Sequence, residues 1–115
     1  MKKAIGYIRV STEQQADEGI SLAAQRAKIN LWCELNDCEL VAIYEDAGIS
    51  GKTIEKRPQL QTALAEIKKG MALVVYSLSR MSRTTNHCIA IADELKAKGS
   101  DLVSITEKLD TSSAM

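Results

Sequence analysis

The sequence predicts an α/β fold of three layers, in which helices cover both faces of a mainly parallel central sheet. Short apolar, β-branched segments alternate along the chain with longer segments of helical period. Alternation of this kind is typical of right-handed crossovers that bury a parallel sheet between helices. The chain has 115 residues and is 45% hydrophobic, which suits a single domain with one core. We expect about four strands and leave room for an additional antiparallel edge strand.

The first strand and the first helix are expected in the first third of the chain. Residues 3–10 are β-branched and apolar enough for a strand that is buried on both faces. Ser21 is a suitable cap for a helix that runs to about Asn36. The apolar face of this helix would consist of Leu22, Ile29 and Trp32.

A second strand and a second helix follow. Residues 40–44 have the pattern of a strand, and residues 45–57 form a polar loop with two glycines. Pro58 suits the first turn of a helix, which we expect to end at Gly70. The inward face of this helix would carry Leu60, Leu64 and Ile67.

The last two strands are expected at residues 72–76 and 102–105, on either side of a third helix. This helix would start near Thr84 and end at Gly99. Its inner face would consist of Cys88, Ile91, Ala92 and Leu95. Residues 107–115 are polar, and we expect no packed element there.

Charge, cysteine content and hydropathy exclude several classes of protein. Fifteen basic and fifteen acidic residues give zero net charge, so a polyanionic partner needs a local basic site. Three cysteines without a Cys-x-x-Cys pair, and a single histidine, argue against a disulfide framework and a Cys/His zinc site. No apolar run reaches the ~18 residues that cross a bilayer. We expect a cytoplasmic protein without membrane contact, metal or cofactor.

Arginines gather where the predicted strands end, which is the edge at which open α/β sheets bind ligands. Four of the five arginines follow strand ends, namely Arg9, Arg57, Arg80 and Arg83. Arg9 and Ser11 would lie on the same side of the first strand, about 7 Å apart. A guanidinium binds phosphate oxygens through two parallel hydrogen bonds and stays charged. A serine among such groups suits transfer of a phosphoryl group to Ser11 without a metal.

Simpler explanations exist for each of these residues. A single arginine at a strand end is more often solvated or paired with an acid, and a serine after a strand usually forms a turn. Residues 48–53 end like a phosphate-binding loop, but two residues rather than four separate the first glycine from Gly-Lys-Thr. His87 lies at the start of a predicted helix, where a surface or capping role is expected rather than catalysis.

The segment Tyr-Ile-Arg-Val-Ser-Thr-Glu-Gln-Gln at residues 7–15 resembles the signature that opens the catalytic domain of serine recombinases, the resolvase and invertase group. Further segments are similar to that family in the same order, namely residues 19–25, 44–51, 57–58, 78–83 and 106–111. The resemblance covers nearly the whole chain. It implies a site-specific DNA recombinase that cleaves and rejoins DNA through a covalent 5′-phosphoserine intermediate.

The resemblance also implies roles for individual residues. Ser11 would be the nucleophile. The cationic residues around the scissile phosphate would be Arg9, Arg80 and Arg83, with Arg57 contributing from its loop. Supporting positions would be Tyr7, Gln15, Gln25, Asp46, Ser50 and Ser79. Many relatives carry an aspartate where this chain has Ser79, which leaves open what replaces the carboxylate. The general base for Ser11 is also open, with Asp46 a candidate by position alone.

Partners and domain organisation are expected from the same resemblance. In the family, a long helix follows a segment like residues 110–115, forms the dimer interface and leads to a DNA-binding domain. Residues 1–115 would then be a catalytic domain that is truncated before both. The partner would be a double-stranded DNA recombination site, on which the full-length parent forms dimers and tetramers. The isolated fragment would be mostly monomeric and inactive and would bind DNA poorly. A resolvase, invertase, transposase or integrase role is left open.

Two other classes of protein would share parts of this pattern. A doubly wound binding or signalling module that responds to phosphate or nucleotide would have the same layers. Such a receiver needs an acidic cluster with a lysine at the sheet edge, whereas here arginines dominate and the nearby acids are Glu45 and Asp46. A phosphatase with a serine nucleophile is the third hypothesis, although nothing in the sequence indicates a pocket for a small substrate.

Overall fold

The computed structural model describes residues 2–10, 21–47, 58–82 and 84–111, which form a five-stranded sheet in the order β2-β1-β3-β4-β5. The strands are Lys2–Val10 (β1), Cys38–Ala47 (β2), Ala72–Val75 (β3), Asp101–Ser104 (β4) and Leu109–Asp110 (β5). The first four pair in parallel, and β5 runs antiparallel to β4. The expected mainly parallel sheet with an antiparallel edge strand is therefore confirmed.

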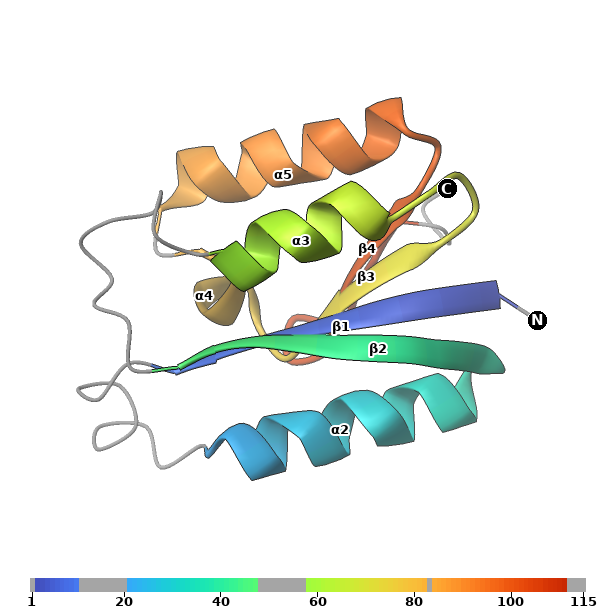
Figure 1. Ribbon diagram of the computed structural model, residues 1–115, viewed down its shortest axis with the longest axis vertical. Helices are drawn as coiled ribbons and strands as arrows, with labels where there is room; N and C mark the ends of the chain where they lie inside the picture. Colours follow the sequence, from blue (N-terminus) through green and yellow to red (C-terminus); the bar gives the residue numbers. More distant parts are fainter. Residues whose placement is uncertain (1, 11–20, 48–57, 83, 112–115) are drawn as a thin grey trace.

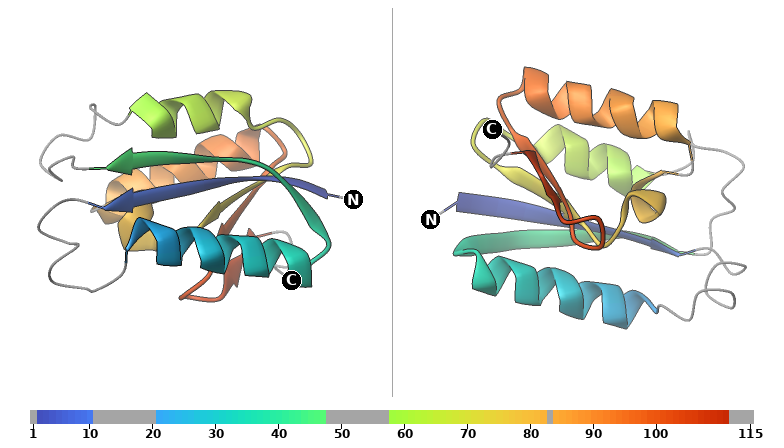
Figure 2. Two further views of the ribbon diagram at one scale, coloured as in Figure 1. Left: turned by 60° about the horizontal axis from the view of Figure 1, so that its bottom comes forward. Right: turned by 180° about the vertical axis from the view of Figure 1, so that it is seen from behind.

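Helices cover both faces of this sheet (Figure 1). Helix α2 (Leu22–Leu35) lies on one face, and helices α3 (Pro58–Glu66) and α5 (Thr85–Ala97) lie on the other. The two further views in Figure 2 show the same three layers. A short helix, α4 (Leu78–Met81), follows β3 directly. Within the described parts of the chain, no helix combines the length and the apolar character that a membrane span requires.

Strand β1 is buried on both faces, as the sequence predicts. Ala4 and Ile8 belong to the core cluster on the side of α2, whereas Ile5 and Tyr7 belong to the cluster on the side of α3 and α5. Side chains alternate between the two faces along a strand. Arg9 therefore follows Ile5 and Tyr7 onto the side that carries α3, α4 and α5.

The starts of α2 and α5 are where the sequence predicts them. The Ser21 hydroxyl accepts a hydrogen bond from the Ala24 N–H at 3.1 Å, and the Thr84 hydroxyl accepts one from the His87 N–H at 3.1 Å. Both residues satisfy an N–H that the helix itself leaves without a partner. Gly99, whose φ is +74°, ends the turn after α5 in a conformation that suits glycine.

The bounds of β2 and α3 differ from expectation by two residues or more, and the sequence did not place the two short elements α4 and β5. Strand β2 is longer than residues 40–44 at both ends. Helix α3 ends at Glu66 rather than at Gly70, because the Met71 N–H bonds to the Lys68 carbonyl in a turn that leads into β3. The prediction of no packed element in residues 107–115 is wrong for β5, and α4 was not expected at all. Elements of four and two residues are too short to show a hydrophobic period.

Candidate active site

The carboxyl ends of β1, β2 and β3 bring distant parts of the chain to one edge of the sheet. Arg9 of β1 is paired in register with Asp46 of β2. Arg80 lies on α4, which directly follows β3. Three residues predicted for the site from separate segments therefore meet at the edge where ligands bind in open α/β sheets.

Arg9 is fully buried and connects β1 to α4. Its exposed fraction is 0%. The Arg9 Nε donates to the Arg80 carbonyl at 3.2 Å, and a terminal nitrogen of the same guanidinium donates to the Ser79 carbonyl. Burying a charge without hydrogen bonds is costly, and these carbonyls offset part of that cost. The position of the Arg9 charge is thus tied to the backbone of α4.

Arg80 supplies a second buried guanidinium at the same edge. Its exposed fraction is 1%, and its carbonyl is the acceptor for Arg9. Both groups stay charged at any physiological pH. Although the chain has zero net charge, two permanently cationic side chains lie on adjoining elements. This arrangement favours an anionic ligand.

Asp46 connects the ends of β1 and β2 to the start of α3. The Tyr7 hydroxyl donates to Asp46 Oδ2 at 2.7 Å, and the carboxylate also accepts the N–H groups of Gln59 and Leu60 at 3.3 and 3.2 Å. A carboxylate at the start of a helix is favoured by the helix dipole and by the free N–H groups there. Three donors thus give Asp46 a structural function at the site edge.

Gln25 contacts the end of β1 from the buried side of α2. Its exposed fraction is 0%, and its Nε2 donates to the Arg9 carbonyl at 3.2 Å. Among the described residues, nothing hydrogen-bonds to Gln25 Oε1. Gln25 thus holds the backbone of Arg9 from the face opposite α4 and offers one further acceptor there.

Ser79 takes part in the site through its backbone. Its carbonyl accepts from Arg9, whereas its hydroxyl lies 3.0 Å from the Ser77 hydroxyl and the residue is exposed. The described residues that the structure brings together are Tyr7, Arg9, Gln25, Asp46, Ser79 and Arg80. The other predicted site residues lie outside the described residues, namely Ser11, Gln15, Ser50, Arg57 and Arg83.

Glu107, in the turn between β4 and β5, contacts this edge and was not predicted as a site residue. Its carboxylate accepts from the Ser104 hydroxyl, from the Thr106 hydroxyl at 2.9 Å and from the Leu78 N–H at 3.3 Å. Desolvation alone would raise the pKa of Glu107, but these hydrogen bonds outweigh it and lower the pKa below its ordinary value. An acidic residue just after the fourth strand is the signal that could have identified it.

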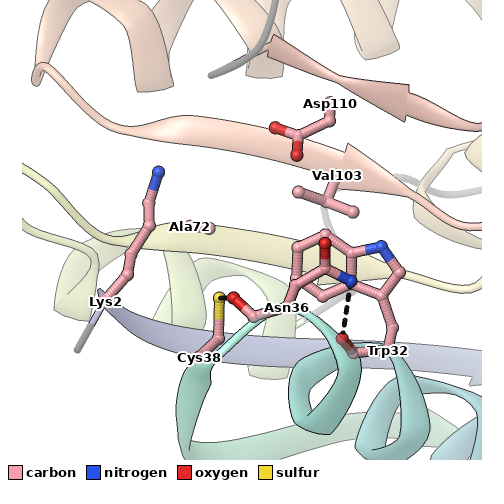
Figure 3. Close-up of a pocket in the computed structure, with 7 residues that line it drawn as sticks. All are labelled: Lys2, Trp32, Asn36, Cys38, Ala72, Val103 and Asp110. Carbon is pink, nitrogen blue, oxygen red and sulfur yellow. Dashed lines mark hydrogen bonds between the residues drawn. The ribbon is translucent and has the colours of Figure 1, made fainter.

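Cavities lie at both edges of the sheet. One of about 220 Å³ lies beside α4 and is lined by Leu78, Ser79, Ser82, Thr84, Thr85 and Cys88. Another, of about 200 Å³, is shown in Figure 3, where Lys2, Cys38 and Ala72 come from the beginnings of β1, β2 and β3. The second cavity is therefore at the opposite edge from Arg9 and Arg80. Both are smaller than the roughly 300–1,000 Å³ of typical small-molecule sites.

Comparison with known proteins shows which family the chain resembles. The family model described as "Resolvase, N terminal domain" matches residues 4–115. A DNA-invertase of Escherichia phage P1 is 39% identical over 111 residues, which are 96% of this chain and 53% of that protein. A DNA-invertase of Salmonella typhimurium is 41% identical over 111 residues, covering 96% of this chain and 52% of that protein. The chain thus spans about half the length of these curated relatives.

Solved structures give the same result. The N-terminal catalytic domain of TP901-1 integrase superposes with a TM-score of 0.83 at 30% identity, covering 99% of this chain and 85% of that one. A resolvase family site-specific recombinase from Streptococcus pneumoniae superposes with a TM-score of 0.82 at 34% identity, covering 99% of this chain and 78% of that one. The fold class predicted from the sequence is that of these proteins.

Proposed function

Because the chain belongs to the resolvase N-terminal domain family, we propose that it is the catalytic domain of a site-specific DNA recombinase. The observation that carries this proposal is the buried Arg9, whose guanidinium is fixed to the carbonyls of Ser79 and Arg80. Two positions further along the chain is Ser11. A nucleophile at that position would act next to cations that are already oriented.

The proposed reaction transfers a phosphoryl group from DNA to the protein. The Ser11 oxygen attacks the phosphorus of a phosphodiester and loses its proton, and the 3′ oxygen leaves and takes up a proton. The product is a 5′-phosphoserine bond and a free 3′-hydroxyl. Because the energy of the ester bond is kept, the reverse attack by a 3′-hydroxyl rejoins the DNA without ATP.

The cationic residues would stabilise the transition state. Negative charge that develops on the phosphoryl oxygens is stabilised most by donors that are oriented before the reaction starts. Arg9 is oriented by α4, and Arg80 is carried by it. We assign the same function to Arg57 and Arg83 from the resemblance, and supporting functions to Gln15, Gln25 and Ser50. No metal or other cofactor is required by this scheme.

The partners follow from the same assignment. The family acts on DNA recombination sites, and we propose a double-stranded site as the substrate of the full-length protein in the cytoplasm. Dimers and tetramers on that DNA, and a dimerisation helix and DNA-binding domain beyond residues 1–115, are part of the proposal. The alternative of a phosphate- or nucleotide-responsive signalling module is not favoured, because the relatives named above are invertases, recombinases and integrases.

Covalent trapping tests the proposed chemistry. Full-length protein is incubated in chelator with a pool of nicked duplexes of randomised sequence, and adducts are isolated under denaturing conditions. We expect wild-type protein to form an adduct whose phosphoryl group maps to Ser11 by mass spectrometry. Ser11→Ala should abolish the adduct, because no other oxygen would stand in its place.

Thr12→Ala is the matched control, since it removes a neighbouring hydroxyl and should leave the adduct intact. Arg80→Lys should slow the formation of the adduct by about a hundredfold, because the loss of oriented donors typically costs 10²–10³ in rate. An adduct that persists in Ser11→Ala rejects this serine as the nucleophile.

A further inference from the structure

A hydrogen bond between Ser82 and His87 joins α4 to α5. Ser82 Oγ and His87 Nδ1 are 2.8 Å apart. Ser82 directly follows α4 and is 2% exposed, whereas His87 is half-buried in the first turn of α5. His87 is the single histidine of the chain. The site described above makes no use of this contact.

Helix α4 depends on its neighbours for its conformation. It has four residues, and one helical turn is not stable by itself because its nucleation is costly. The Ser82 N–H completes the turn by donating to the Leu78 carbonyl at 2.9 Å. The position of Ser82 therefore decides whether α4 keeps its last backbone hydrogen bond.

Contacts from β1 and from α5 hold the second half of this turn. From β1, Arg9 donates to the carbonyls of Ser79 and Arg80. From α5, His87 bonds to Ser82, and the Cys88 thiol lies 3.6 and 3.8 Å from the carbonyls of Leu78 and Ser82. The thiol contacts are long and weak, so the bond from His87, at 2.8 Å, is the shortest of these three contacts between α5 and the end of α4.

We propose that His87 is a positioning residue for Arg80. Ser82 directly follows α4, the helix that carries Arg80, so a displacement of Ser82 moves the backbone of that helix. This inference rests on the proposed function, which assigns Arg80 to the scissile phosphate. Phosphoryl transfer is sensitive to displacements of about 1 Å in its catalytic groups.

The contact can form in either direction. The Thr84 N–H points to Ser82 Oγ at 3.4 Å, and the hydroxyl keeps one hydrogen and a second lone pair, so it can donate to His87 Nδ1 or accept from it. If the hydroxyl donates, a neutral imidazole accepts at Nδ1 and carries its own hydrogen on Nε2. An asparagine at this position places an amide acceptor near the location of Nδ1, whereas an alanine places nothing there.

The first experiment measures α4 without any DNA. Hydrogen exchange of the full-length protein is followed by mass spectrometry in wild type, His87→Ala, His87→Asn and the matched control Asn86→Ala, which changes an exposed neighbour in the same turn. Loss of the contact lets the turn open locally, so we expect exchange in residues 78–82 to be about tenfold faster in His87→Ala. His87→Asn should restore slow exchange, and Asn86→Ala should not alter it. Unchanged exchange in His87→Ala overturns the proposal.

The second experiment measures adduct formation on the pool of nicked duplexes. His87→Ala should slow it by about tenfold, because a lost hydrogen bond is worth about that factor, and His87→Asn should recover most of the rate. Ser82→Ala should be at least as slow, because it also removes the acceptor of the Thr84 N–H, and the double variant should be no slower than Ser82→Ala, since both changes remove the contact between Ser82 and His87. A purely structural defect would instead lower the amount of folded protein and leave the rate per folded molecule unchanged.

The two experiments separate this proposal from the proposed function. If wild-type protein forms no adduct, the recombinase chemistry fails, and the exchange experiment still decides whether His87 holds α4. If wild type forms the adduct and His87→Ala forms it equally fast per folded molecule, the positioning function is wrong and the recombinase chemistry stands.

Discussion

Arg9 and Tyr7 show how single residues of one strand connect three elements. Both lie on the same face of β1 and both are 0% exposed. Tyr7 donates to Asp46 of β2, and Arg9 donates to the backbone of α4. An arginine is rarely buried to this degree unless its N–H groups are bonded. The end of β1 is therefore specified by polar contacts as much as by the apolar core.

The hydrogen bond from Tyr7 to Asp46 is expected to stabilise the domain. Tyr7→Phe should lower the free energy of unfolding by about 2 kcal/mol, because it removes a donor from a buried carboxylate. Tyr44→Phe is the matched control, since the Tyr44 hydroxyl also donates to a carboxylate, that of Glu66, but at the surface. Urea unfolding of both variants measures the two changes in the free energy of unfolding. Equal changes would show that burial does not strengthen the contribution of the Tyr7 hydrogen bond.

At the scale of elements, α4 is the part of the candidate site that depends most on its surroundings. It is contacted by β1 through Arg9, by α5 through His87, and by the β4–β5 turn through Glu107. Ser77, which precedes α4, makes no capping bond with its side chain. The Glu107 carboxylate takes over that function by accepting the Leu78 N–H.

The Glu107 contact predicts a pH-dependent contribution to stability. The hydrogen bonds that Glu107 accepts hold its pKa below the ordinary value of 4.5. A lowered pKa in the folded state means that the contribution is present above about pH 4.5 and is lost as the pH falls through the folded-state pKa. We expect Glu107→Gln to be less stable than wild type at pH 7, and the difference to shrink below pH 4.5.

Urea unfolding over a series of pH values measures this difference. Glu39→Gln, which changes an exposed glutamate of β2, controls for the loss of one negative charge. A difference between Glu107→Gln and wild type that is the same at every pH would show that the carboxylate is not bonded in solution.

At the scale of the whole molecule, the charges are balanced overall and concentrated locally. The net charge is zero, with fifteen basic and fifteen acidic residues. Among the described residues, Arg9 and Arg80 are both buried at the carboxyl edge of the sheet. Affinity for duplex DNA comes largely from the number of phosphates that a basic surface neutralises. A few buried arginines suit a single reacting phosphate better than a long stretch of duplex.

Residues 1–115 by themselves should therefore bind duplex DNA weakly. We expect a dissociation constant above about 1 µM at physiological salt, in the range of non-specific binding. Fluorescence anisotropy with a labelled duplex, repeated over a series of salt concentrations, measures it, and the full-length protein on the same duplex is the control. Specific binding below micromolar concentration by residues 1–115 would contradict the expectation.

The sequence alone determined the layers, the order of the main elements and several of their ends. Hydrophobic period predicted β1, β3, β4 and the three longer helices, and local capping chemistry predicted where α2 and α5 begin, because these signals lie within a few neighbouring residues. The types of residue at the strand ends also indicated phosphate chemistry, since a guanidinium has that preference wherever it is placed. The resemblance to serine recombinases rested on the same short segments.

The tertiary structure alone decided how those residues are held. The contact between Arg9 and the Arg80 carbonyl joins positions 71 residues apart, and no local pattern encodes such a pair. Helix α4 and strand β5 have four and two residues, so they form because neighbouring elements satisfy their backbone groups and not because their own sequences favour them. The bond between Ser82 and His87 spans only five residues, but it depends on how the chain passes from the end of α4 into the first turn of α5.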